Sequence, residues 1–208
     1  MAEFAELIGP TYRAASPIAD TERCVNWIPE VIGGGAKGQN QIYYRPRPGH
    51  RTFTFLRDSP VRDLFSLNGR LFAVAGASFY EVFPSQTYAL RGTAVSDGKP
   101  ATISSNGKNG NQLFVISGGK GYIYNLITDV ITAVADADFQ SDIEPVSMGS
   151  QSDGYFIALK AQSNSFFISA LLDGNDWDLL DVYQVSQSSG DELVALFVLH
   201  REIYVCSR

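Results

Sequence analysis

The stretch Asn68-Gly69-Arg70-Leu71-Phe72-Ala73-Val74-Ala75-Gly76, followed by Phe79-Tyr80-Glu81-Val82, decides the fold of this 208-residue chain. The two runs rich in Val, Ala, Phe and Tyr have the length of β-strands, and Asn-Gly supplies the positive φ angles of a tight hairpin turn. Similar short runs recur along the chain, whereas helical periodicity is hard to find beyond a turn or two. The sequence therefore predicts an all-β protein made of hairpins, with further turns at Asn109-Gly110, Asp153-Gly154 and Asp173-Gly174.

The hairpins repeat. Runs that resemble Leu71-Phe72-Ala73-Val74 begin at residues 113, 155 and 202, at successive offsets of 42, 42 and 47 residues. A period of about 40–45 residues with several strands per unit is typical of a β-propeller blade. We therefore expect β-propeller blades at about 59–97, 98–140 and 141–188 and a partial blade at 189–208. Because a closed ring typically needs about 4–8 blades, we expect these three and a half blades to be a fragment of a larger propeller.

Residues 1–58 have a different composition. They hold five of the nine prolines and the Gly-rich run from Gly33 to Asn40. This composition predicts an extended N-terminal arm with a Pro/Gly-rich loop, and not a blade. Two roles are open for such an arm, which are contact with a neighbouring subunit and packing across the propeller's own face.

The overall composition restricts the class of protein. A hydrophobic content of 45% is enough for a packed core, and 16 basic against 22 acidic residues give a net charge of −6. This balance disfavours a strongly basic nucleic-acid binder. Cys24 and Cys206 are too far apart in sequence and too few for a disulfide framework, so we expect free thiols. No apolar run is long enough for a membrane-spanning helix, and the N-terminus lacks the basic residues of a secretory signal. We therefore expect a soluble protein made in the cytoplasm.

The motifs for catalysis are weak. In the Gly-rich run, Lys37 is followed by Gly38 where a phosphate-binding loop needs Ser or Thr. The two Ser-x-x-Lys matches, which end at Lys108 and Lys120, fall in Gly- and Asn-rich turns, where the two side chains do not share a helical face. His50 and His200 are isolated from any nucleophile motif. We therefore predict a protein that is not an enzyme and has no catalytic or cofactor-binding site.

The densest acidic cluster runs from Asp173 to Asp181. Asp173, Asn175 and Asp181 partly fit a calcium loop, but Trp177 stands where an acidic ligand belongs. We interpret the cluster as a solvated loop of a blade, with weak calcium binding as the alternative, and predict no metal site.

Five pieces of the first 85 residues, in their order and spacing, resemble a known family. They are Arg23-Cys24-Val25-Asn26-Trp27-Ile28-Pro29-Glu30, the Gly-Lys-rich loop Gly33–Asn40, Tyr44-Arg45-Pro46-Arg47-Pro48-Gly49, Ser59–Leu64, and Asn68–Gly76 with Phe79–Val82 after it. The set is similar to the N-terminal part of the packaged-DNA stabilisation proteins of short-tailed bacteriophages, which are tail accessory or hub proteins with a β-propeller body. The chain departs from the pattern at Arg47 and His50, where the family has a small and an apolar residue.

The resemblance implies a structural role in the virion tail. Such proteins form a homo-oligomeric ring, usually of six copies, below the portal and its adaptor ring and above the distal tail proteins. They extend the DNA channel and help to hold the packaged genome until ejection. A net charge of −6 is compatible with double-stranded DNA that passes through the channel without strong charge-driven binding.

The candidate residues are therefore structural. We expect Arg23, Asn26, Trp27, Pro29 and Glu30 to fix the arm to the body or to a neighbour, and Pro46, Pro48 and Gly49 to set a rigid turn into the first blade. The main alternative is a monomeric propeller that binds carbohydrate or peptide at its channel mouth. A hydrolase on a propeller scaffold is a weaker one, because fold alone does not choose among these functions.

Overall fold

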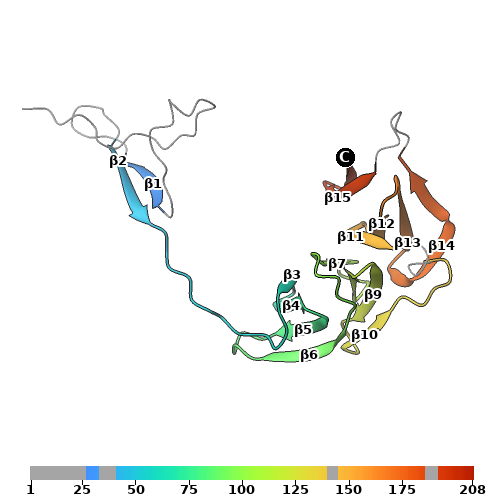
Figure 1. Cartoon of the computed structure of the whole chain (residues 1–208), viewed down its shortest axis with the longest axis horizontal. Coiled ribbons are helices and arrows are strands. Elements are labelled where there is room, and N and C mark those ends of the chain that lie inside the picture. The colour runs from blue at the N-terminus through green and yellow to red at the C-terminus, as the bar shows by residue number, and fades with distance from the viewer. Residues whose placement is uncertain (1–26, 33–40, 140–144, 186–191) are drawn as a thin grey trace, which may run out of the picture. The chain divides into compact units, whose positions relative to one another are not determined.

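The computed structural model describes residues 27–32, 41–139, 145–185 and 192–208, and the chain divides into two compact units, residues 1–52 and 53–208. Every regular element in the described residues is an antiparallel β-strand (Figure 1). In the first unit, β1 (Trp27–Ile32) pairs with β2 (Gln41–Pro46) in a two-stranded sheet. The sequence patterns did not reveal this hairpin. The Gly-rich run between its strands lies outside the described residues.

The second unit consists of four sheets in chain order, each a meander in which consecutive strands pair. The first sheet holds β3 (Val61–Leu67), β4 (Arg70–Ala75), β5 (Ser78–Val82) and β6 (Tyr88–Thr93). The second holds β7 (Thr102–Ser105), β8 (Gln112–Ser117), β9 (Lys120–Asn125) and β10 (Val130–Ala133). The third holds β11 (Val146–Ser152), β12 (Tyr155–Lys160), β13 (Ser165–Ala170) and β14 (Asp173–Gln184). The fourth has only β15 (Leu193–Leu199) and β16 (Glu202–Ser207). The prediction of an all-β protein with three and a half propeller blades is confirmed.

The tight turns explain why the strands start where they do. Asn68-Gly69, Asp153-Gly154 and His200-Arg201 each have two successive positive φ angles, as two-residue hairpins require. The predicted turn at Asn109-Gly110 is present, and Gly110 N–H donates to the carbonyl of Gly107 at 3.3 Å, but the positive φ angles of the connection belong to Gly107 and Asn111.

The prediction for the acidic cluster is also wrong. Asp173-Gly174 is no turn, and the whole cluster belongs to strand β14 instead of a solvated loop. The turn that precedes β14 uses Leu172, with a φ of 61°. Gly174 is needed for another reason, because a Cβ at this position would lie 2.3 Å from Cδ1 of Ile123 on the second blade. Trp177 is 3% exposed and donates its indole N–H to the carbonyl of Gly174 at 2.8 Å, so the strand is anchored inward.

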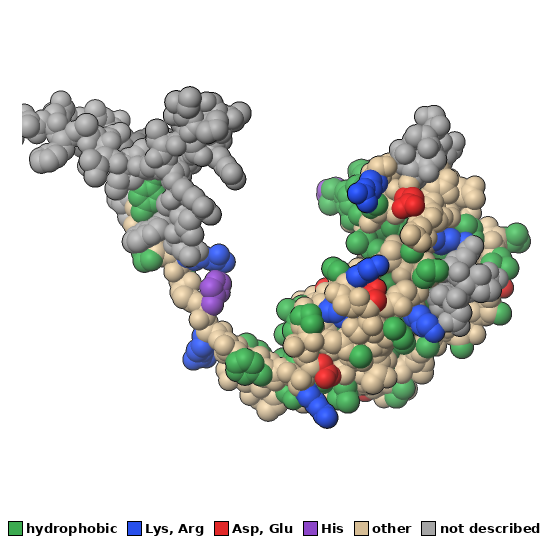
Figure 2. Space-filling model, viewed as in Figure 1, with side chains coloured by type: hydrophobic (Ala, Val, Ile, Leu, Met, Phe, Trp, Pro, Cys, Tyr) green, Lys and Arg blue, Asp and Glu red, His purple; other side chains and the backbone are tan. Residues whose placement is uncertain are grey.

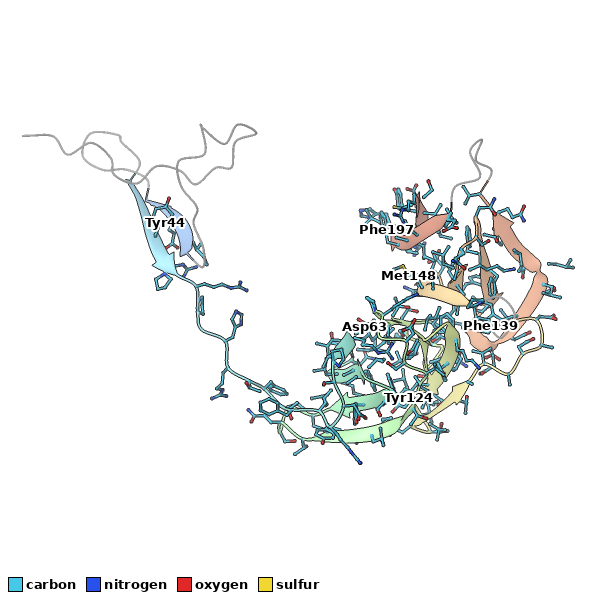
Figure 3. All side chains as sticks on the ribbon, in the orientation of Figure 1. Tyr44, Asp63, Tyr124, Phe139, Met148 and Phe197 are labelled. Carbon is cyan, nitrogen blue, oxygen red and sulfur yellow. The ribbon has the colours of Figure 1, made fainter. Side chains whose placement is uncertain are left out.

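The core lies between blades, not within them. The first and second blades enclose one apolar cluster that includes Phe72, Phe79 and Tyr124, with ring centroids 5.1–5.8 Å apart. The second and third blades enclose another, in which Phe114 and Phe139 contact Trp177. The third blade and the β15–β16 sheet enclose a third cluster, which consists of aliphatic side chains together with Met148 and Phe166. Figure 3 labels Tyr124, Phe139 and Met148 in these layers.

The two outermost faces of the second unit differ. On the free side of the first blade, Leu56 packs against the small residues Ala73 and Ala75, and Tyr80 donates to the carboxylate of Asp58 at 2.6 Å. The segment before β3 therefore covers this face. On the free side of the last sheet, Phe197 and Tyr204 stack with centroids 5.1 Å apart, yet they are 47% and 40% exposed. This second face is apolar and uncovered within the described residues.

The inter-blade cluster makes a direct prediction about stability. Phe114→Ala should lower the free energy of unfolding by about 3–5 kcal/mol, because a fully buried ring is lost between two blades. Phe55→Ala, at a side chain that is 81% exposed, is the matched control and should change it by no more than about 0.5 kcal/mol. Urea unfolding followed by circular dichroism measures both. Equal effects of the two substitutions would contradict the inter-blade core.

Candidate functional site

The family-like residues come together on the hairpin of the first unit. The register of β1 and β2 places Trp27 opposite Pro46 and Pro29 opposite Tyr44. The two sequence pieces that are some twenty residues apart are therefore neighbours in one sheet. Glu30 on β1 forms an exposed ion pair with Nε of Arg45 at 3.8 Å. Arg23 and Asn26 lie outside the described residues.

The stretch after β2 is extended. Pro48 and Gly49 are exposed, and residues 47–56 form neither a strand nor a turn. Gly49 does not have the left-handed φ that a glycine turn uses. That Pro46, Pro48 and Gly49 set the direction of the chain into the first blade stays a prediction, and the two prolines restrict the backbone there.

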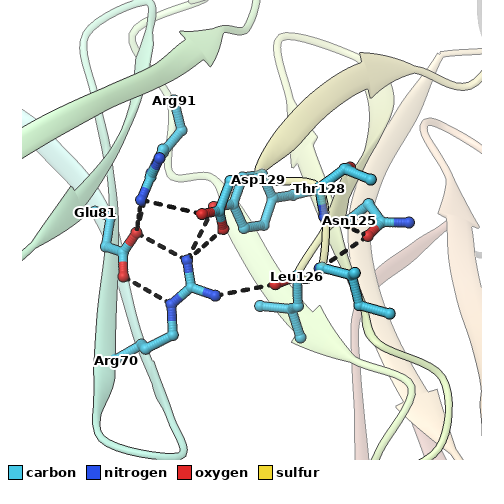
Figure 4. Close-up of polar contacts among 9 residues, drawn as sticks. Arg70, Glu81, Arg91, Asn125, Leu126, Thr128 and Asp129 are labelled. Atoms are coloured by element: carbon cyan, nitrogen blue, oxygen red, sulfur yellow. Dashed lines mark hydrogen bonds and ion pairs between the residues drawn. The ribbon is translucent and has the colours of Figure 1, made fainter.

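A charged network joins the first two blades (Figure 4). Arg70 on β4 donates to both carboxylate oxygens of Glu81 on β5, at 2.7 and 2.8 Å. Arg91 on β6 donates to the same carboxylate at 2.6 Å. Both arginines also pair with Asp129 of the second blade, at 2.5 and 3.3 Å, and Tyr124 donates to it at 2.7 Å. Five side chains from two blades thus form one network of hydrogen bonds and ion pairs.

Burial makes this network important for stability. The Glu81 side chain is only 5% exposed, and its pKa is lowered mainly by the hydrogen bonds from Arg70. The pKa of Asp129 is lowered by Arg70 and then by Tyr124, whereas burial and the Asp129 hydrogen bond raise the pKa of Tyr124. A buried carboxylate that loses its cation is left uncompensated, which is strongly destabilising.

Arg62 on β3 is a second link between blades. Its side chain is 2% exposed and donates to the carbonyls of Gly76 at 2.9 Å and Lys99 at 3.1 Å. It also donates to the hydroxyl of Ser117, at the end of β8 in the second blade, at 2.5 Å. The carboxylate of Asp97 lies 3.6 Å away and balances the charge. Arg62 therefore fixes the connection between the two blades.

The first strands of successive blades are joined by a repeated side-chain to backbone hydrogen bond. The three bonds run from Ile103 N–H to the Asp63 carboxylate, from Gly149 N–H to Thr102 Oγ1 at 2.9 Å, and from Leu196 N–H to Met148 Sδ at 3.4 Å. Burial raises the pKa of Asp63, against the opposite effect of the N–H groups that it accepts. On β15 the corresponding residue after the strand bulge is Ala195, whose side chain has no acceptor. The series therefore ends at the last sheet.

The described residues contain no cluster of side chains suited to hold a metal ion. No group of three or more His, Cys, Asp or Glu side chains converges on a possible ion in this part of the chain. Likewise, none of the described elements is a helix long and apolar enough to cross a membrane. Cys206 is an exposed free thiol, while Cys24 lies outside the described residues.

A hollow of about 380 Å³ lies between the second and third blades. Its lining includes Lys99, Ser117, Gly119, Pro145 and Gln162, and it has no aromatic side chain. A carbohydrate site at a propeller mouth was expected to combine polar groups with aromatic ones. This hollow does not have that composition.

The sequence did not reveal the Arg70 network or the Arg62 link. Their partners are separated by 10 to 59 residues in the chain, and charged residues inside strands usually indicate solvent-facing positions. The only sequence feature that pointed to the network was that Glu81 lies among apolar residues in the run Phe79-Tyr80-Glu81-Val82.

The network predicts a dependence of stability on pH. The pKa values of Glu81 and Asp129 are lowered in the folded protein, so their stabilisation is present above their unfolded pKa values. It is lost in acid, as the pH falls below the ordinary carboxyl range and through the lowered pKa values of the folded protein. Glu81→Gln should lower the free energy of unfolding at pH 7 by about 3 kcal/mol and flatten this acid dependence. Asp176→Asn, at an exposed position of β14, is the control and should leave both unchanged. Urea titrations at a series of pH values measure the effect, and parallel curves for the Glu81→Gln variant and the wild type would exclude the network as its source.

Two solved structures are similar to this chain at low sequence identity. The extracellular domain of the putative one component system BT4673 from B. thetaiotaomicron is 11% identical, with a TM-score of 0.50, over 80% of this chain and 22% of that one. The WD40 domain of Neurospora crassa Pan2 is also 11% identical, with a TM-score of 0.44, over 86% of this chain and 56% of that one. This chain thus spans about half or less of the length of these structures. None of the curated proteins compared with the chain matches it.

A family model covers most of the chain. The family described as Bacteriophage P22 Gp10, beta-propeller, matches residues 35–208, which include every blade of the second unit. The match agrees with the resemblance carried by the N-terminal sequence pieces and with the observed blades. The chain therefore belongs to this phage tail accessory and DNA stabilisation family.

Proposed function

We propose that the chain is a non-enzymatic structural component of a phage tail hub. In this role it extends the DNA channel below the portal and adaptor ring and helps to retain the packaged genome until ejection. The observation that carries the proposal is the family match over residues 35–208. That family implies a structural role in the virion tail and assembly with other virion proteins.

The described residues are compatible with a structural role. Their buried charged side chains join neighbouring blades, as Arg70, Glu81 and Asp129 do. The last sheet has Phe197, Leu199 and Tyr204 at 40–52% exposure, an apolar face against which a further sheet or a partner can pack.

The proposed assembly is a ring of six copies, with distal tail proteins below it. A ring needs heterologous contacts, in which each subunit presents two different surfaces to its two neighbours. In our proposal the arm supplies one of them, with Arg23, Asn26, Trp27, Pro29 and Glu30 as its fixing residues. The prolines at 46 and 48 and Gly49 then set how far the arm extends.

Removal of the arm tests this assignment. Deletion of residues 1–30 should weaken ring assembly, because the contacting residues are lost, while the β-sheet signal of the blades in circular dichroism stays intact. A full-length variant with residues 1–30 in scrambled order is the matched control and should fail in the same way. Sedimentation velocity measures the assembly state. Full rings from the deletion variant would show that the arm is not the subunit contact.

A further inference from the structure

Charge is distributed unevenly along this acidic chain. Residues 31–57 contain five Lys or Arg residues and no Asp or Glu, whereas residues 58–208 contain seventeen acidic and nine basic residues. The net charge of −6 therefore conceals a basic segment beside an acidic body. The density is highest in Arg45-Pro46-Arg47-Pro48-Gly49-His50-Arg51, which we call the basic segment.

The basic segment is accessible. Every residue from Arg45 to Thr52 is exposed, and beyond the end of β2 the backbone forms neither strand nor turn. Figure 2 shows the colours of Lys or Arg and of His side chains along the stretch that follows β2. The guanidinium groups can therefore be approached by a large ligand.

The charges of the basic segment are not neutralised by strong ion pairs within the described residues. Arg45 has Glu30 at 3.8 Å, but the two side chains are 56% and 44% exposed, and such a pair contributes little. Neither Arg47 nor Arg51 has an ion pair in the part of the chain that the structure describes. The positive charge is thus available for a partner.

The geometry of the basic segment suits a linear polyanion. Seven residues in an extended chain span at most about 25 Å, which is close to the length of seven phosphates at about 3.4 Å per residue of one DNA strand. Guanidinium groups bind phosphate oxygens in a bidentate manner. Pro46 and Pro48 limit the conformations of the free segment, so less entropy is lost when it binds.

The composition of the basic segment argues against an acidic protein surface as its partner. Interfaces between proteins depend on a few buried aromatic or apolar anchors surrounded by polar residues. The stretch from Arg45 to Thr52 has no Phe, Tyr, Trp or large aliphatic side chain, and the exposed Phe53 and Phe55 lie beyond it. It offers a row of charges, which is how proteins hold a nucleic-acid backbone without reading its sequence.

We propose that the basic segment, residues 45–51, binds the phosphate backbone of double-stranded DNA. This goes beyond the proposed function, in which DNA passes the body without strong charge-driven contact. That expectation followed from the average charge of the chain, whereas the binding site is local. On average the acidic body repels DNA, whereas the basic segment attracts it.

The test is the salt dependence of DNA binding by the full chain. A fluorescein-labelled 30-base-pair duplex is titrated with protein at 50 to 200 mM NaCl, and anisotropy gives Kd. The triple variant Arg45→Gln, Arg47→Gln, Arg51→Gln should bind at least tenfold more weakly at 50 mM NaCl. The slope of log K against log salt should fall by about 2–3, since each phosphate contact contributes about 0.9. The corresponding triple Lys variant should keep most of the slope.

The matched control removes the same charge from the acidic body. Lys99→Gln, Lys108→Gln, Arg201→Gln changes three exposed cations of the second unit and should leave DNA binding within twofold of the wild type. No binding by the wild type at 50 mM NaCl, or equal losses in the two triple Gln variants, would overturn the proposal. Displacement of the duplex by poly-glutamate as effectively as by unlabelled duplex would overturn it too, in favour of an acidic protein partner.

Sedimentation of the same variants separates this inference from the proposed function. If the Arg45/Arg47/Arg51 variant still forms rings but no longer binds DNA, the result supports DNA binding by the basic segment and shows that ring formation does not depend on it. DNA binding by a chain that never forms rings would contradict the tail-ring function and leave the basic segment in place.

Discussion

The constraint on which the rest of the structure depends is that a single four-stranded blade cannot bury its own apolar faces. A sheet with large side chains on both sides has to pack against something on each side. Here Phe72 and Phe79 of one blade meet Tyr124 of the next, and Phe114 meets Trp177 one blade further on. The polar links follow from this packing. Glu81 is buried against Arg70, and the second blade adds Asp129 as a further partner of that arginine.

The same constraint determines the two ends of the unit. On the free face of the first blade, Ala73, Ala75, Tyr80 and Val82 are buried under the segment around Leu56 and Asp58. The last sheet has the large side chains Phe197 and Tyr204 half-exposed on its free face, and Ala195 there has no side-chain acceptor to continue the series of hydrogen bonds between first strands. Within the described residues, one end of the unit is therefore covered and the other exposes apolar side chains.

Much of the fold could be predicted because its signals are local. Short Val- and Phe-rich runs, Asn-Gly and Asp-Gly turns and a period near 42 residues each depend on neighbouring residues only, and they give the blades almost strand by strand. The β1–β2 hairpin was missed because Pro29 lies inside β1, and proline argues against a strand unless both strands are edges, as in a two-stranded sheet. The turn predicted at Asp173-Gly174 was wrong because the glycine serves another purpose. It leaves room for Ile123 of another blade, and a contact between blades cannot be read from the local sequence.

The candidate site was less predictable than the fold. The residues expected to matter were found from a resemblance in the N-terminal pieces, and the structure places Trp27, Pro29 and Pro46 on one hairpin. The charged links between blades join residues far apart in sequence, so only the folded chain shows them. The basic segment was missed because the expectation about DNA used the net charge of the whole chain, which does not show where the charges lie.

The most direct test of the tail-hub account is electron microscopy of the native assembly, with its rotational symmetry determined. The account predicts a six-fold ring with an axial hole wide enough for a DNA duplex, about 20 Å or more, with the blades of each subunit packed face to face. Monomers only, from the full-length protein at micromolar concentration, would contradict it.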